Sequence, residues 1–237
     1  MVAFGGIKNS FLYSSELLAI TGQEFIIFIT RTFSVAMRFL KKYFLCLLLL
    51  YCSHSYAQSK NDSVFSAEFI STTQLADAKA GEIIHLGRGI GTGKPVLFIF
   101  LSPECPLCQQ YSLVLNKLYG EYGKKVNFYG IIPGKTFDAN TINGFSEKYK
   151  IAFPLYIDRV LKLSRYLQAT ATPEVILLDN RSELLYKGAI DDWFADLGKQ
   201  RSRTTKNFLH DALDQQLGGE PVAVKRTKAI GCYINDY

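Results

Sequence analysis

Two cysteines separated by two residues are the part of this 237-residue chain best suited to chemistry. They form the sequence Cys105-Pro106-Leu107-Cys108, which follows the apolar run PVLFIFL at 95–101 and a short polar turn. An apolar run of that length predicts a strand buried on both faces. Apolar residues at three- and four-residue spacing then predict a helix from Pro106 to about Tyr119. Cys105 is therefore expected at the start of a helix.

This position favours thiol chemistry. Unpaired amide groups and the dipole of a helix N-terminus stabilise a thiolate, and comparable sites lower a cysteine pKa from about 8.5 to roughly 3.5–7.5. Pro106 stiffens the first turn without losing a hydrogen bond. Cys108 lies one turn further on, close enough to form a small-loop disulfide and to resolve a mixed disulfide. The spacing predicts Cys105 as the nucleophile and Cys108 as the resolving thiol.

Other uses of the pair are weaker. A zinc site needs two further ligands, and beyond residue 57 the chain offers only Cys232, His85 and His210, none of them in a paired spacing. Two inert cysteines would be expected inside an apolar helix face, not at a helix start. The glycine-rich segment at 87–93 lacks the GK[ST] ending of a phosphate loop. Thiol exchange needs no cofactor, and we expect none.

Two further residues are secondary candidates. Cys232 follows the last predicted helix, and three uses remain open for it: a third redox thiol that folds back toward Cys105, a point of intermolecular pairing, or a spare buried cysteine. Asp191 follows a predicted strand and is a candidate buried carboxylate for relaying protons to the thiols. Aspartates at strand ends more often form turns or caps.

The surrounding pattern alternates strands and helices. Strands are predicted at 82–86, 95–101, 125–132, 154–157, 174–178 and 184–190, and helices at 106–119, 138–149, 159–167 and 204–217. This order predicts an α/β fold with a mostly parallel sheet, helices on both faces and antiparallel strands at one side.

The N-terminal region has the layout of a secretory signal peptide over 37–57. A basic stretch from Met37 to Lys42 precedes an apolar run at 43–51, and small residues at Ser55 and Ala57 predict cleavage after Ala57. The apolar run of about nine residues is short of the roughly 20 needed to span a bilayer. An uncleaved anchor is the weaker alternative, as is a lipoprotein acylated at Cys52. Residues 1–36 are interpreted as an upstream extension or leader, with Met37 as the initiator.

The rest of the chain divides into an N-terminal arm or edge strand at 58–81, a domain at 82–218 and a C-terminal tail at 219–237. The net charge of +6 falls to +3 without 1–57, which carries five basic and two acidic residues. No run of more than two basic residues remains, so no nucleic-acid binding is expected. Membrane contact is expected only through an uncleaved signal segment. The predicted location is exported, periplasmic or otherwise extracytoplasmic, where thiol pairs are used as disulfides.

The strand-CPLC-helix unit, with Thr172-Pro173 about 65 residues later at the opening of a strand (TPEVILLD), resembles the thioredoxin-like superfamily. The resemblance is to its exported redoxin branch, related to the alkyl hydroperoxide reductase/thiol-specific antioxidant group. It covers roughly 82–217 and includes YKGAIDD at 186–192 and Gly231-Cys232. It implies a three-layer fold with a central mixed sheet. It also implies that Pro173 is a cis-proline that faces the cysteines and keeps them from capturing a metal, and that Thr172 presents its backbone to a substrate strand.

The expected site therefore comprises Cys105, Cys108 and Pro173 for the chemistry, with Thr172 and Pro106 contacting the substrate. The resemblance implies an exported thiol–disulfide oxidoreductase that acts with a protein dithiol or disulfide partner, or with an upstream reductant.

Two alternatives stay open. In a peroxiredoxin-like thiol peroxidase, Ser102 fits the hydroxyl position three residues before the nucleophile, but Phe98 stands at a proline position. A copper-delivering assembly factor would use two cysteines with three residues between them and a distant histidine. This chain has two residues between its cysteines and no matching histidine.

Overall fold

The computed structural model describes residues 64–88 and 92–235. The predicted signal segment and the upstream extension lie outside these ranges. Over the described ranges, none of the helices combines the length and the apolar character that crossing a bilayer requires.

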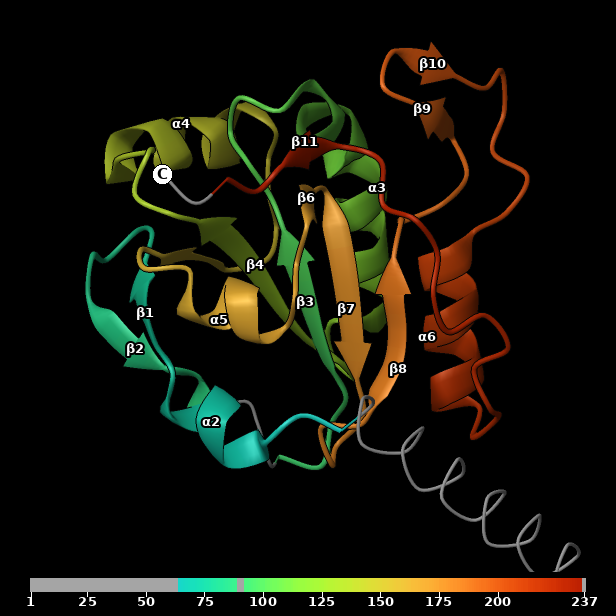
Figure 1. Ribbon diagram of the computed structural model, residues 1–237, viewed down its shortest axis with the longest axis horizontal. Coiled ribbons are helices and arrows are strands. Elements are labelled where there is room, and N and C mark those ends of the chain that lie inside the picture. The colour runs from blue at the N-terminus through green and yellow to red at the C-terminus, as the bar shows by residue number, and fades with distance from the viewer. Residues whose placement is uncertain (1–63, 89–91, 236–237) are drawn as a thin grey trace, which may run out of the picture. The chain divides into compact units, whose positions relative to one another are not determined.

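A seven-stranded mixed sheet forms the centre of the fold, in the order β2-β1-β5-β4-β3-β7-β8 (Figure 1). Its middle consists of the parallel strands β3 (Val96–Phe100), β4 (Asn127–Pro133) and β5 (Leu155–Asp158). On one side, β7 (Glu174–Leu178) runs antiparallel to β3, and β8 (Leu184–Gly188) antiparallel to β7. All five residues of β3 are buried, as predicted for a strand covered on both faces.

The other side of the sheet corrects the sequence prediction. Strand β1 (Gln74–Asp77) pairs antiparallel with both β5 and β2 (Ile83–His85), so antiparallel strands flank the parallel centre on both sides. The segment interpreted as an arm or edge strand thus supplies the short helix α2 (Ala67–Thr72) and an inner strand. The sequence of β1, QLAD, buries the adjacent residues Leu75 and Ala76, so it carries no alternating pattern that would identify it.

Helices cover both faces and produce the three expected layers (Figure 1). Alternate residues of β3 point to opposite cores. Leu97 and Ile99 pack with residues of α3 (Pro106–Tyr122), α4 (Ala139–Lys148) and α6 (Phe208–Leu217). Phe98 and its neighbours on that face pack with α2 and α5 (Lys162–Tyr166). The α/β architecture with a central mixed sheet is confirmed.

Several short elements lie outside the central sheet. A single 3-10 turn covers Leu86–Arg88, and a small hairpin, β9 (Phe194–Asp196) and β10 (Lys199–Gln200), precedes α6. Strand β6 (Ala171–Thr172) pairs antiparallel with β11 (Cys232–Tyr233), so the C-terminal segment returns to the connection before β7 (Figure 1).

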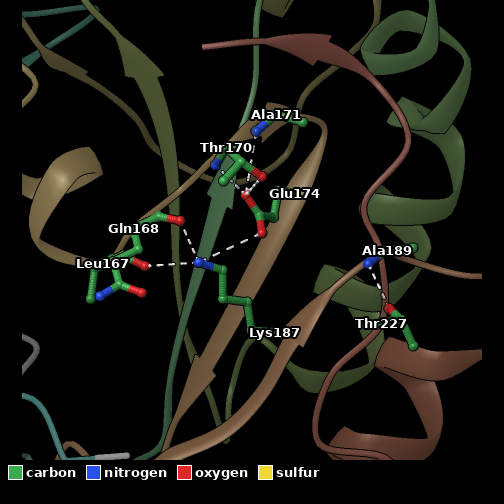
Figure 2. A network of polar contacts seen from close by, with 8 residues as sticks. All are labelled: Leu167, Gln168, Thr170, Ala171, Glu174, Lys187, Ala189 and Thr227. Atoms are coloured by element: carbon green, nitrogen blue, oxygen red, sulfur yellow. Dashed lines mark hydrogen bonds and ion pairs between the residues drawn. The ribbon is translucent and has the colours of Figure 1, made fainter. Parts of the chain in front are cut away.

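The position of β6 is set by the buried carboxylate of Glu174, the first residue of β7. Its Oε2 atom accepts hydrogen bonds from the Thr170 amide at 2.6 Å, the Thr170 hydroxyl at 3.2 Å and the Ala171 amide at 3.4 Å (Figure 2). The carboxylate thus fastens the chain entering β6 to the start of β7.

Lys187 of β8 is the cationic partner of Glu174. Its ammonium group lies 3.8 Å from Glu174 Oε1 and donates to the carbonyls of Leu167, at 3.1 Å, and Gln168 (Figure 2). Only 11% of the Lys187 side chain and 4% of the Glu174 side chain are exposed. Burial lowers the pKa of Lys187, and the charge of Glu174 opposes this shift. The pair ties β8, β7 and the end of α5 to β6.

Replacing Lys187 with Met should destabilise the protein by about 3 kcal/mol, because it leaves a buried carboxylate without its cation. Urea unfolding at neutral pH measures the change. The control is Lys199→Met, which breaks an exposed pair with Asp196 and should cost well under 1 kcal/mol. Equal effects of the two variants would show that the buried pair does not hold β6.

Candidate active site

The first cysteine of the pair lies where the sequence places it. Cys105 is the N-cap of α3, its carbonyl accepts the Gln109 amide at 3.1 Å, and Pro106 is the first helical residue. The Cys105 side chain makes no capping bond, so its sulfur is free for other contacts. Pro106 is exposed beside it.

Cys108 lies one turn into α3 and is fully buried. Its sulfur is 3.4 Å from the Ser102 amide, which donates to it from the loop between β3 and α3. Both cysteines are buried, but Cys105 stands at the start of the helix and Cys108 one turn inside it.

The segment that follows β6 approaches Cys105 from a distant part of the chain. The Thr172–Pro173 peptide bond is cis, as the resemblance implies for this position. The Thr172 carbonyl accepts the Cys105 thiol at 3.1 Å, and Thr172 is buried. The structure therefore brings Cys105, Thr172 and Pro173 together at one place, next to Cys108.

Cys232 is the third sulfur of the site. Its thiol donates to Cys105 Sγ at a sulfur–sulfur distance of 2.9 Å, and its backbone pairs with Thr172 across β11 and β6. All three cysteines are free thiols. Among the three uses that the sequence leaves open for Cys232, the structure has the geometry of a residue folded back toward Cys105.

The three sulfurs differ in their readiness to ionise. The Cys108 thiol donates to Cys105 and lowers the pKa of Cys105 from the usual value of 9.0 to about 5, against the opposing effect of burial and with a second contribution from the Cys232 thiol. Burial, and then the hydrogen bond to Cys105 and the charge on Cys105, raise the pKa of Cys232 to about 12. Burial also raises the pKa of Cys108 well above its ordinary value. Of the three sulfurs, Cys105 therefore ionises most readily, and it lies next to the thiols of Cys108 and Cys232.

The Thr172 carbonyl can accept the Cys105 thiol only while that thiol is protonated. Once Cys105 ionises, the sulfur becomes an acceptor, and the thiols of Cys108 and Cys232 satisfy it. The site therefore has a stable hydrogen-bonding pattern for both protonation states.

Asp191 does not join the thiols. Its carboxylate accepts the Tyr111 hydroxyl at 2.6 Å and the Trp193 amide at 2.9 Å, and burial raises its pKa. These bonds occupy it on the face of α3 beyond Cys108. No hydrogen bond in the described residues connects it to a sulfur, and its role as a proton relay stays a prediction.

The two described histidines also lie elsewhere. His85 contacts the Thr72 carbonyl at 3.3 Å, whereas His210 on α6 approaches Asp214 at 3.3 Å. His210, Asp214 and Glu121 bring one ligand atom each within 4.8 Å of one another, which is a metal-like spacing on the partly exposed surface of α3 and α6. None of these residues contacts a cysteine sulfur among the described interactions.

Sequence reasoning missed Glu174 and Lys187, which position the Thr172 backbone. A signal for them existed. Glu174 opens an otherwise apolar five-residue strand, EVILL, in which every residue is buried, and a charge at such a position requires a buried partner.

Comparison with known proteins agrees with this geometry. The AhpC/TSA family matches residues 68–187, which run from α2 to β8. Thiol-disulfide oxidoreductase ResA from Halalkalibacterium halodurans is 29% identical over 93 residues, 39% of this chain and 52% of the relative. The chain thus spans about half the length of that curated relative.

Two solved structures share the fold. A hypothetical protein from Sinorhizobium meliloti 1021 has a TM-score of 0.62 at 24% identity, covering 70% of this chain and 91% of that one. A conserved protein from Geobacillus kaustophilus has a TM-score of 0.62 at 22% identity, covering 70% and 89%. The family match spans half of the chain and contains the cysteine pair, Thr172 and Pro173, so the thioredoxin-like redoxin resemblance is confirmed. The chain belongs to the AhpC/TSA family.

Proposed function

We propose that this protein is a thiol–disulfide oxidoreductase that uses Cys105 and Cys108. The observation that carries the proposal is the contrast between the two sulfurs. The pKa of Cys105, at the start of α3, is lowered to about 5, whereas burial one turn away raises the pKa of Cys108. A nucleophile and a protected resolving thiol are what disulfide exchange requires.

The reaction proceeds by two exchanges. The Cys105 thiolate attacks one sulfur of a partner disulfide, whose S–S bond breaks, and the departing partner sulfur takes up a proton. Cys108 then loses its proton and attacks Cys105 Sγ, which breaks the mixed disulfide and releases the second partner sulfur as a thiol. The products are a Cys105–Cys108 disulfide and a reduced partner, and the reverse sequence oxidises a dithiol.

The partner is a protein dithiol or disulfide, or an upstream reductant of the same chemistry. The backbone of Thr172 supports this, because it belongs to a strand edge beside the nucleophile that can pair with an extended segment. The partial match to a protein named thiol-disulfide oxidoreductase supports it independently. Export to an extracytoplasmic compartment is proposed from the signal-peptide pattern at 37–57.

Cys105→Ser should reduce turnover of a protein disulfide such as insulin to the rate of the uncatalysed control, since serine cannot form the mixed disulfide. Cys108→Ser should retain the first attack but stop there, so mass spectrometry should find the partner attached to Cys105. Wild-type turnover by Cys105→Ser would rule out the mechanism. If hydrogen peroxide instead oxidises Cys105 far faster than any disulfide does, the peroxidase alternative is preferred.

The Cys105 thiolate should titrate with a midpoint near pH 5, so that about 99% of it is ionised at pH 7. Exchange by Cys105 should therefore lose its nucleophile as the pH falls through 5. Thiolate absorbance in the ultraviolet, with Cys105→Ser as the blank, measures the midpoint.

Cys232→Ala removes one S–H donor and should raise the midpoint by about one pH unit, whereas Cys232→Ser keeps a donor and should move it less. A wild-type midpoint above pH 8 would contradict this account.

A further inference from the structure

The nucleophile of the proposed reaction is covered in this structure. Cys105 is 2% exposed and Thr172 is 3% exposed, although a substrate must reach both. The cavities of about 240 and 530 Å³ on the sheet are lined by other residues and include none of the three cysteines. What lies against Cys105 and Thr172 is the chain's own C-terminal strand, β11.

Strand β11 pairs with the edge of β6 in the way that an extended substrate peptide would. Cys232 stands opposite Thr172 and Tyr233 opposite Ala171, and the Ile234 amide donates to the Thr170 carbonyl at 3.0 Å. Extended peptides bind an open strand edge by the same antiparallel pairing. The register also places a cysteine at the one position that faces the nucleophile, 2.9 Å from its sulfur.

The residue before Cys232 is fitted to this contact. A Cβ atom at Gly231 would lie 2.1 Å from the Thr172 carbonyl oxygen and 2.6 Å from its carbon, so a side chain here would force β11 away from β6. The backbone of Gly231 does not have a positive φ. Close approach, rather than an unusual conformation, is therefore what requires glycine at this position.

A second anchor holds the tail four residues upstream. The Thr227 amide donates to the Lys187 carbonyl at 3.0 Å, and the Thr227 hydroxyl accepts the Ala189 amide at 2.9 Å (Figure 2) and contacts the Tyr186 hydroxyl at 2.6 Å. Gly188 makes room for it, since a Cβ there would lie 2.2 Å from Thr227 Oγ1. The tail is thus fixed at the end of β8 and again at β6.

We propose that β11 is an internal substrate strand and that Cys232 is a third redox-active cysteine, which exchanges with the Cys105–Cys108 disulfide. This proposal rests on the proposed oxidoreductase function. The match to the AhpC/TSA family ends at Lys187, so β11 lies beyond the matched segment.

The exchange is balanced without an external reagent. In the oxidised protein, Cys232 loses its proton to solvent, and its sulfur attacks Cys105 Sγ. The Cys105–Cys108 bond breaks, and the Cys108 sulfur leaves with the electron pair and takes up a proton. The product contains a Cys105–Cys232 disulfide and a Cys108 thiol, which is the internal counterpart of a substrate mixed disulfide.

An internal strand at this place competes with an external substrate for the same edge of β6. A substrate strand can pair with β6 only when β11 leaves it, and because the tail is tethered, its local concentration does not depend on dilution. Releasing β11 should therefore expose Cys105 to external reagents.

The disulfide formed by Cys232 is tested in the Cys108→Ser variant. The variant protein is reduced and then mixed with one equivalent of oxidised glutathione. Glutathione should first bond to Cys105 and then be displaced by Cys232, so that peptide mapping finds a Cys105–Cys232 disulfide in a monomer. In the matched control, Cys108→Ser with Cys232→Ser, the glutathione adduct should persist. A persistent adduct in the single variant, or a dimer linked through Cys232, would each overturn the proposal.

The second claim, that β11 covers Cys105, is tested by the Gly231→Val variant and by a chain that ends at Lys228. Both should increase the rate of Cys105 alkylation by iodoacetamide at neutral pH about tenfold or more, because both remove β11 from β6. Ala223→Val, at an exposed tail position outside β11, should leave the rate unchanged. Equal rates in the wild type and in both release variants would overturn the proposal.

Different results would contradict the oxidoreductase function and the role of Cys232. Protein-disulfide turnover that survives Cys105→Ser defeats the oxidoreductase function. Turnover that depends on Cys105, together with no Cys105–Cys232 disulfide and no effect of releasing β11, defeats only the role given to Cys232 and the tail.

Discussion

The site depends on the buried carboxylate of Glu174, which fixes the backbone that leads to Thr172. It accepts hydrogen bonds from the chain just before Thr172 and faces the ammonium group of Lys187, which in turn holds the carbonyls at the end of α5. A buried charge of this kind is tolerated only when its partners satisfy it, so the surrounding backbone has little freedom. That constraint holds the Thr172 backbone where it contacts both Cys105 and β11.

The chemistry of the site follows from the sharing of a single negative charge. Cys105 at the helix start accepts hydrogen bonds from two thiols that are themselves held protonated, one by burial in α3 and the other largely by its partial burial beside the charge. Such an arrangement stabilises the thiolate form of Cys105 and places two further sulfurs next to it.

Strong local patterns predicted most of the fold. The apolar run that became β3, the amphipathic segment of α3 and the hairpin of β7 and β8 all occur where periodicity and turn residues place them. The sequence does not indicate β1 as an inner strand, because it buries two adjacent residues and has no alternation; its pairing with β2 and β5 defines it. The hairpin of β9 and β10 has no such signal either, since β9 buries only its first residue and both residues of β10 are exposed.

The same division applies to the site. Local sequence determined the pair Cys105 and Cys108 at a helix start, because a buried strand, a short turn and Pro106 act over neighbouring residues only. The resemblance to a family indicated Thr172 and Pro173. Only the tertiary structure decided that Asp191 bonds to Tyr111 instead of the thiols, that Glu174 and Lys187 pair beneath β6, and that Cys232 reaches Cys105 across 127 positions of sequence. These contacts join residues distant in the chain through backbone pairing and close approach at Gly231, which no local pattern encodes.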